Sequence, residues 1–269
     1  MIPPPKTLTI AGSDSGGAAG LQADLKTFTA LQTYGLSVIT VATAQNSQTI
    51  TALHPLPPTF VAQQLTTVLS DYAPPAIKTG FLGSADLIHT LTPCLADYQP
   101  QYLIIDPVLV NHKGESMFPP EVAEAYQKQL FPLATLITPN RAEATLFTNL
   151  PITNWDEGQT AVRALHQLGA PAVLLKGVPD GNHLVDLFYD GTMLGGWRTP
   201  RHDTTNTHGS GDTLSAAILA YLAHGQPLNQ AVGDAHYFTQ QAIYHARDWQ
   251  LGAGHGPLNQ MWELPAPIL

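Results

Sequence analysis

The sequence predicts a three-layer α/β domain in which a mostly parallel, doubly wound central sheet is flanked by helices. Short apolar segments rich in Val, Ile, Leu and Thr alternate with longer amphipathic segments along the 269 residues. The short segments lack a regular polar–apolar alternation, which is typical of strands that are buried on both faces of a parallel sheet. No stretch rich in Pro, Gly or Ser divides the chain, so we interpret residues 1–269 as a single domain.

The predicted elements follow one another as repeated strand–helix–strand units, which form parallel sheets through right-handed crossovers. Strands are expected at Thr7–Ala11, Ser37–Ala42, Ile77–Thr79, Tyr102–Asp106, Leu136–Thr138 and Ala172–Lys176. Helices are expected at Leu21–Leu31, Thr59–Leu69, Ala85–Leu95, Glu121–Leu130 and Asp156–Leu168. An Asp-Gly pair at 190–191 predicts a hairpin between Val185–Tyr189 and Thr192–Trp197, and two long helices follow at Gly211–Ala223 and Leu228–Ala246.

The charge and composition restrict the partners that this chain can have. The formal net charge is -9 and the isoelectric point is about 5.5, which disfavours nucleic acid and anionic membranes. The single cysteine, Cys94, excludes an intrachain disulfide. No apolar run approaches the ~20 residues that span a bilayer. We therefore expect a soluble, cytoplasmic protein with a small-molecule partner, which can include phosphate held at a helix N-terminus.

The strongest local pattern is Thr207–Asp212, with the letters THGSGD, at the start of the helix predicted over Gly211–Ala223. Its two glycines can expose successive backbone N–H groups to an anion, and the helix N-terminus adds positive potential. A carboxylate at Asp212 can then accept a proton from an attacking alcohol while the amides hold the transferring phosphoryl group. The alternative is an ordinary helix cap by Asp or Ser.

A second pattern follows the strand predicted at Leu136–Thr138. Asn140 and Glu143 are three residues apart and can share one face of a helix. Their oxygens can orient water on a Mg²⁺ ion, which commonly keeps several of its waters. The same spacing is also that of a capping box, in which the two side chains bond to the backbone N–H groups of the first turn. Both interpretations can hold at once.

Further polar residues follow predicted strands, where ligands bind in sheets of this class. The small-residue segment Ala11–Gly20 lets a ligand approach the backbone, but it lacks the Gly-Lys-Ser/Thr ending of a P-loop. Lys176 precedes a glycine and can reach a phosphate or be an ordinary exposed lysine, whereas Asp106 can face a metal or form a turn. The amide of Gln45 can donate and accept in one plane, as an aminopyrimidine edge requires.

Together these segments resemble the ribokinase-like superfamily and, within it, the hydroxymethylpyrimidine/phosphomethylpyrimidine kinases of thiamine biosynthesis, with pyridoxal kinases as close relatives. The resemblance covers the chain from Leu8 to about Leu258. It is carried by the segments LTIAGSDSGGAAGLQADLKTF, AQNS, KTGFLG, IDPVLV, ITPNRAEA, LLKG, THGSGDTLSAAI and GHGPLN. The resemblance implies a kinase that uses ATP and Mg²⁺, and family habit implies a homodimer.

The resemblance also implies roles for individual residues. Asp212 matches the position of the catalytic base, and the backbone of Gly209, Ser210 and Gly211 matches the anion hole. The positions expected to line the substrate site are Gly12, Asp24, Gln45, Phe81 and Val108. The positions expected to bind ATP are Lys176, Thr207, Asn140 and Glu143, and those expected to act on Mg²⁺, through water, are Asp106 and Glu143.

The substrate expected from this resemblance is 4-amino-5-hydroxymethyl-2-methylpyrimidine, followed by its monophosphate. One alternative is a pyridoxal kinase, because Asp212 stands where the pyrimidine kinases commonly have Cys. Another is a non-catalytic pyrimidine-binding protein, which would have no use for an intact Gly-Ser-Gly-Asp. Gln45-Asn46 and the segment Gly254–Pro257 favour the pyrimidine. Three further departures are Ala18 and Val178, which replace glycines, and Phe81, which replaces a frequent Met.

Overall fold

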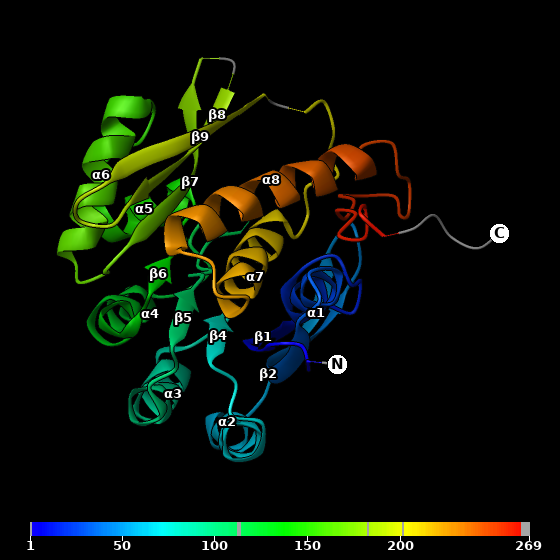
Figure 1. The fold of residues 1–269 in the computed structure, drawn as a ribbon, viewed down its shortest axis with the longest axis vertical. Coiled ribbons are helices and arrows are strands. Elements are labelled where there is room, and N and C mark those ends of the chain that lie inside the picture. Colours follow the sequence, from blue (N-terminus) through cyan, green and yellow to red (C-terminus); the bar gives the residue numbers. More distant parts are fainter. Residues whose placement is uncertain (1, 112–113, 182, 201, 265–269) are drawn as a thin grey trace.

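The computed structural model describes residues 2–111, 114–181, 183–200 and 202–264. Within these residues a nine-stranded sheet has the order β3-β2-β1-β4-β5-β6-β7-β8-β9. Neighbouring strands from β2 to β7 are parallel, whereas β3 at one edge and β8 and β9 at the other are antiparallel (Figure 1). The predicted fold, a mostly parallel doubly wound sheet between helices, is therefore confirmed.

The bounds of the elements agree with the predicted order. The strands are β1 Lys6–Ser13, β2 Tyr34–Gln45, β3 Ile50–Pro55, β4 Ala76–Thr79, β5 Tyr102–Ile105, β6 Leu136–Ile137, β7 Val173–Asp180, β8 His183–Tyr189 and β9 Leu194–Pro200. The helices are α1 Gly20–Ala30, α2 Pro58–Tyr72, α3 Ala85–Tyr98, α4 Pro120–Ala125, α5 Arg141–Thr148, α6 Trp155–Gln167, α7 Ser210–Ala223 and α8 Leu228–Ala246. None of the described helices is long and apolar enough to cross a membrane.

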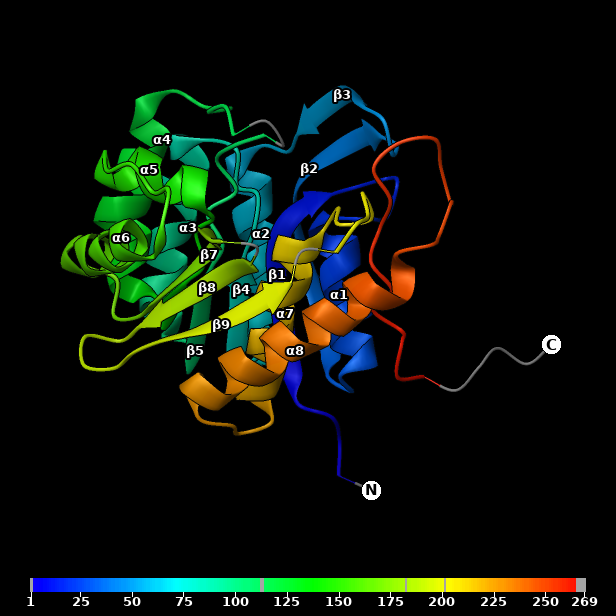
Figure 2. The same cartoon turned by 90° about the horizontal axis from the view of Figure 1, so that it is seen from above.

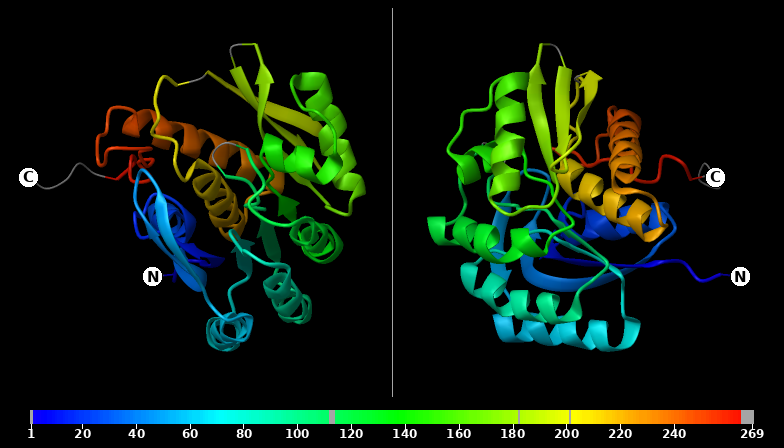
Figure 3. Two further views of the ribbon diagram at one scale, coloured as in Figure 1. Left: turned by 180° about the vertical axis from the view of Figure 1, so that it is seen from behind. Right: turned by 60° about the vertical axis from the view of Figure 1, so that its left-hand side comes forward.

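Each face of the sheet buries its own apolar core. Side chains of α2 to α6 pack against one face, and those of α1, α7 and α8 pack against the other. Figures 2 and 3 show α7 and α8 crossing the sheet beside α1, on the side away from α2 and α3. Successive residues of β5 serve both cores, because Leu103 and Ile105 face one side and Ile104 the other. Because both faces of these strands are buried, their sequences are continuous apolar runs without alternation.

Two elements differ from the prediction. The sequence did not indicate β3, since every residue of Ile50–Pro55 is exposed at the edge of the sheet and no apolar pattern marks it. The helix predicted over Glu121–Leu130 is interrupted: α4 ends at Ala125 and continues as a π-helical turn, Tyr126–Leu130, and then a 3₁₀ turn, Phe131–Leu133. The six strands β1, β2, β4, β5, β6 and β7 are parallel, so their carboxyl ends lie on the same side of the molecule. The polar motifs predicted from the sequence lie on this side.

Candidate active site

Two cavities open at the carboxyl ends of the parallel strands, and they adjoin each other at the loop Thr207–Asp212 before α7. The first has a volume of about 450 Å³ and lies between the carboxyl ends of β1 and β2 and the segment after β5. The second has a volume of about 530 Å³ and lies between β7 to β9 and helices α7 and α8. Four residues line both cavities: Asn140, Thr207, Ser210 and Gly211. A group transferred between two ligands would therefore pass this loop.

Helix α7 starts in a form that leaves its first amides available. Its N-cap is Gly209, with a left-handed backbone (φ 87°), and no side chain caps the helix. No backbone carbonyl of the described chain accepts a hydrogen bond from the N–H groups of Gly211 and Asp212. An anion at this point would meet these donors and the positive end of the helix. The alternative interpretation of Asp212 or Ser210 as the helix cap is wrong.

The loop before α7 is packed tightly on the loop after β1. A Cβ atom at Gly209 would lie 1.9 Å from the carbonyl oxygen of Ala18, so this position requires glycine. Asp14 organises the facing loop, because its carboxylate accepts hydrogen bonds from the N–H groups of Gly16, Ala18 and Ala19 at 2.8–2.9 Å. Ala18 is not among the residues with a positive φ, so its replacement of a glycine carries no backbone strain.

Lys176 lies within β7, which continues to Asp180 and does not end at Lys176 as predicted, and it links the residue after β5 to the start of α7. Its Nζ donates to Oδ1 of Asp106 at 2.9 Å, and the Oγ of Ser215 donates to the other oxygen at 3.0 Å. A Cβ atom at Gly211 would lie 3.1 Å from the same Nζ, so this cation sits beside the exposed amides. Asp106 and Lys176 thus lie beside this loop, and their roles toward metal and phosphate stay predictions.

Asp212 is half-buried and lines the first cavity. Burial raises the pKa of its carboxyl above the ordinary value, and the neighbouring charge of Asp106 raises it further. The charges of Lys78 and Lys176 and a hydrogen bond from the Gly20 N–H lower the pKa and favour the carboxylate. A carboxylate with a raised pKa, next to amides that can hold an anion, is suited to accept a proton from an alcohol.

Asn140 and Glu143 form the capping box of α5. The Asn140 side chain accepts from the Glu143 N–H at 3.0 Å, and Glu143 accepts from the Asn140 N–H at 2.9 Å. The other oxygen of Glu143 accepts from the Leu109 N–H at 3.1 Å. Burial raises the pKa of Glu143 to about 8, and the nearby charge of Asp106 contributes. The capping interpretation is confirmed, whereas the metal interpretation stays a prediction.

The first cavity contains four of the five residues that the resemblance assigned to the substrate. Gly12, Gln45, Phe81 and Val108 line it. A Cβ atom at Gly12 would lie 2.8 Å from Cγ1 of Val41, so any larger residue would press into the cavity wall. Contact of these residues with a substrate stays a prediction.

Asp24 is not one of the residues that line either cavity. It is fully buried, with one carboxylate oxygen 2.5 Å from Nζ of Lys78 and the other accepting from Oγ1 of Thr9 at 2.6 Å. Lys78 is fully buried as well, in the middle of the sheet. The expectation that Asp24 lines the substrate site is therefore corrected: it holds a buried cation whose charge acts on Asp212.

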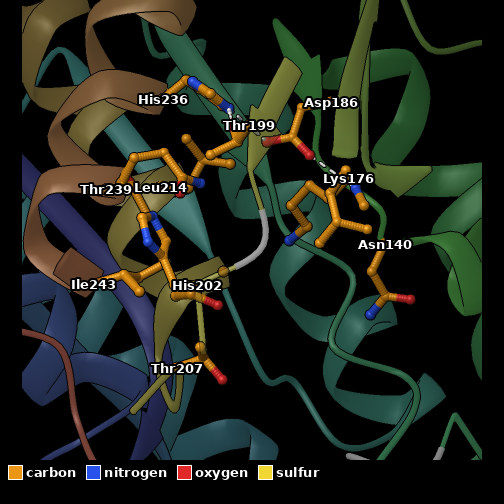
Figure 4. A pocket seen from close by; sticks show the side chains of 15 residues that line it. Asn140, Lys176, Asp186, Thr199, His202, Thr207, Leu214, His236, Thr239 and Ile243 are labelled. Carbon is orange, nitrogen blue, oxygen red and sulfur yellow. Dashed lines mark hydrogen bonds and ion pairs between the residues drawn. The ribbon is translucent and has the colours of Figure 1, made fainter. Parts of the chain in front are cut away.

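The second cavity combines cationic, amide and apolar surfaces. Figure 4 shows Lys176 and Asn140 on one side of it, facing Leu214 and Ile243 on the other. Asp186 fixes the turn after Lys176, since its Oδ1 accepts from the Gly177 N–H at 2.8 Å. A phosphate chain can follow the cation and amides while a flat base lies against the apolar wall.

The position of Val178 explains another departure from the family pattern. Its side chain is fully buried and packs against α6, where a Cβ atom at Gly158 would lie 3.0 Å from its Cγ1. It is not among the residues that line the second cavity. The replacement of a glycine by Val178 therefore serves core packing and leaves the lining of that cavity to its neighbours.

Comparison with known proteins identifies the family of this chain. Residues 14–259 match the family model described as phosphomethylpyrimidine kinase. The chain belongs to this family. It is 40% identical to the hydroxymethylpyrimidine/phosphomethylpyrimidine kinase of Bacillus subtilis, over 94% of each chain. It is 43% identical to the thiamine biosynthesis bifunctional protein ThiED of Geobacter sulfurreducens, matching 97% of this chain but 53% of that protein, so it spans about half the length of that relative.

The predicted ribokinase-like fold agrees with the solved structures of the family's relatives. The structure of the Bacillus subtilis pyridoxal kinase in complex with ADP superposes with a TM-score of 0.89 at 35% identity. The alignment covers 97% of this chain and 99% of that one. This phosphomethylpyrimidine kinase family member therefore shares its architecture with enzymes named for pyrimidine and for pyridoxal.

Sequence reasoning missed several residues of the site. Asp14 has no separate role in the sequence analysis, which treats it as part of the segment Ala11–Gly20, although a polar residue directly after β1 could have indicated its role. His208 lies inside the THGSGD motif, but its side chain was given no function. In the second cavity His236 on α8 contacts Oγ1 of Thr199 at 2.9 Å and lies 3.7 Å from Asp186. The sequence carries no signal for His236, since its partners come from distant strands.

Proposed function

We propose that this kinase transfers the γ-phosphoryl group of ATP to the hydroxymethyl group of 4-amino-5-hydroxymethyl-2-methylpyrimidine, and then to the resulting monophosphate. One observation carries the proposal. Asp212 faces the first cavity at the point where the second cavity meets it, beside the available amides of α7. The pyrimidine would lie in the first cavity and ATP in the second.

In this proposal the residues of the chain act by position and charge. Asp212 accepts the proton of the hydroxymethyl oxygen as that oxygen attacks the terminal phosphorus of ATP. The bond from that phosphorus to the bridging oxygen breaks, and ADP leaves. The N–H groups of Gly211 and Asp212 and the Nζ of Lys176 stabilise the charge on the transferring group.

We expect Mg²⁺ to be held through water and phosphate near Asp106 and Glu143, two residues that are not among those lining either cavity. Asp106 and Glu143 are buried carboxyl groups close enough for the charge of one to raise the pKa of the other, which a divalent cation would relieve. Their oxygens already accept hydrogen bonds from the protein. Within the described residues no three His, Cys, Asp or Glu side chains form a metal cluster. When bound, the ion would neutralise the phosphates.

Pyridoxal kinase is the second candidate, because of the structural likeness to a pyridoxal kinase and because Asp212 replaces the common Cys. An ATP-consumption assay with the pyrimidine, its monophosphate and pyridoxal decides between the candidates. We expect turnover with both pyrimidines and a lower kcat/KM for pyridoxal. Turnover of pyridoxal alone would replace our proposal, and no turnover of any of the three would favour a binding protein. The homodimer and the cytoplasmic location stay predictions.

A further inference from the structure

The amide of Gln45 has a side-chain partner that the sequence analysis did not consider. Its Nε2 lies 3.1 Å from Nε2 of His208, and its Oε1 accepts from Oγ1 of Thr43 at 3.3 Å. Gln45 and His208 are 163 residues apart in the chain, and both line the first cavity. Gln45, which we propose contacts the pyrimidine, is thus bonded to a residue of the loop Thr207–Asp212 before α7.

His208 is itself held firmly on both sides. Its N–H donates to the carbonyl oxygen of Gly256 at 3.1 Å, and the next residue is fixed by the close approach of Gly209 to Ala18. The tail that supplies Gly256 also bonds to the loop after Gln45, since the His255 N–H donates to the Ser47 carbonyl oxygen at 2.8 Å. The backbone that carries the imidazole is therefore held in place at the cavity wall.

Gln45 is the hydrogen-bond partner that the structure gives the Nε2 of His208. Two other titratable groups lie near this ring, Asp14 and His255. Oδ2 of Asp14 lies 3.8 Å from the Nε2 of His208, beyond hydrogen-bond distance, and already accepts from two backbone N–H groups. The ring of His255 lies at a centroid distance of 6.0 Å. Nε2 of a neutral imidazole can accept one N–H of the Gln45 amide.

We infer that His208 is a positioning residue that sets which way the Gln45 amide faces and thereby selects an aminopyrimidine. This inference rests on the proposed function. A carboxamide has two orientations related by a half turn, which exchange its oxygen and its NH₂ group. The acceptor on His208 favours one of them, leaving Oε1 and the second N–H toward the ligand. An aminopyrimidine edge carries a donor beside an acceptor and matches that order, whereas the hydroxyl and aldehyde of pyridoxal do not.

Kinetics of His208→Leu and His208→Gln test this inference. Leucine cannot accept the Gln45 N–H, so the KM for the pyrimidine should rise about tenfold while kcat and the KM for ATP change less than about twofold. Glutamine can accept that N–H and should keep the KM near the wild-type value. The matched control is His89→Leu on α3, which removes a similar contact between His89 and Gln129 far from both cavities and should change no constant.

A double-mutant cycle with Gln45→Met separates positioning from other roles. In the Gln45→Met background His208→Leu should leave the KM for the pyrimidine unchanged, because the amide that His208 orients is gone. An equal rise in both backgrounds, or a fall in kcat at constant KM, would overturn the inference. If His208→Leu does not fold, His208→Asn, whose shorter side chain does not reach Gln45, is judged by the same criteria. A wild-type enzyme without pyrimidine kinase activity would instead contradict the proposed function.

Discussion

The Nζ of Lys176 lies 2.9 Å from Oδ1 of Asp106, beside Gly211, which lines both cavities. One cation therefore balances a buried carboxylate and faces the amides of α7. We expect Lys176→Met to lower kcat/KM for ATP by roughly 100-fold, since it removes a donor to the transferring group and leaves Asp106 unpaired. Steady-state kinetics with varied ATP check this.

The control for that substitution is Lys128→Met. Lys128 forms an exposed ion pair with Glu124 beside α4, outside both cavities. Surface pairs of this kind contribute little, so its kinetics should match those of the wild type. Equal kinetics for the two variants would show that Lys176 does not act on the phosphate.

Replacement of the proposed base tests the chemistry directly. Asp212→Asn keeps the shape of the side chain but cannot accept a proton. Turnover should fall by roughly 100-fold or more, while the affinity for nucleotide stays nearly the same. Kinetics combined with nucleotide binding measure both quantities. A fall of less than about fivefold would mean that Asp212 is not the base.

The pKa of Asp212 predicts how activity depends on pH. The base acts as the carboxylate, and burial raises its pKa above the ordinary value of 3.8, so activity should fall on acidification at a higher pH than for an exposed Asp. Lys78 lowers this pKa, so Lys78→Met should move the acid limb of kcat/KM to still higher pH. Profiles between about pH 5 and 9 measure the shift. An unmoved limb in a folded variant contradicts the electrostatic coupling.

Glu143→Gln separates metal binding from capping. Burial raises the pKa of Glu143 to about 8 when no metal ion is bound, and a bound Mg²⁺ would favour the carboxylate form. Glutamine cannot ionise in this way, so the substitution should raise the Mg²⁺ concentration that gives the half-maximal rate. The capping role alone predicts only a lower thermal midpoint, equivalent to about 1 kcal/mol. Both are measured on one sample, and an unchanged Mg²⁺ titration with a lower midpoint would leave Glu143 as a cap.

Glu143→Gln should also change the way in which the stability of the fold depends on pH. Folded Glu143 keeps its proton up to about pH 8, whereas the unfolded chain releases it near 4.5. The folded state thus binds more protons in this window, and the stabilisation present at low pH is lost as pH rises. Because Gln has no proton to release, the thermal midpoint of the variant should decline less steeply over the window than that of the wild type.

Gln45→Met tests the choice of substrate. The Gln45 amide can accept from the exocyclic amine of the pyrimidine and donate to the adjacent ring nitrogen. The wild type should therefore prefer the aminopyrimidine over pyridoxal by roughly tenfold or more in kcat/KM, and the variant should lose most of this preference with its KM for ATP unchanged. If the ratio of the two kcat/KM values does not move, Gln45 is not the residue that discriminates.

The sequence predicts those parts of the fold that burial marks. The parallel strands are apolar because both faces are covered, and the repeated strand–helix–strand units indicated that they run parallel. The strand β3 left no such mark, since its residues are all exposed. The break after α4 was also missed, because a π-helical turn depends on packing rather than on composition.

The residues of the candidate site could be predicted where they lie together in one short segment. The loop Thr207–Asp212 shows its glycines and carboxylate in a row, and the structure keeps them together. Relations between distant segments were not predictable from spacing. Asp24 follows the glycine-rich loop and was expected at the substrate, yet its partner is Lys78, which β4 places beneath it. His208, in the loop before α7, contacts Gln45 at the end of β2, and nothing in the spacing of the two residues indicates this contact.

The tail around Gly254–Gly256 bears on the order in which the enzyme matures. It bonds to Ser47, 207 residues earlier in the chain, and to the backbone of His208. During translation the parallel strands have left the ribosome long before this tail. We therefore expect a nascent chain that stops near residue 245 to contain most of the sheet but to lack a complete substrate wall, which is completed only once residues 254–256 have been made.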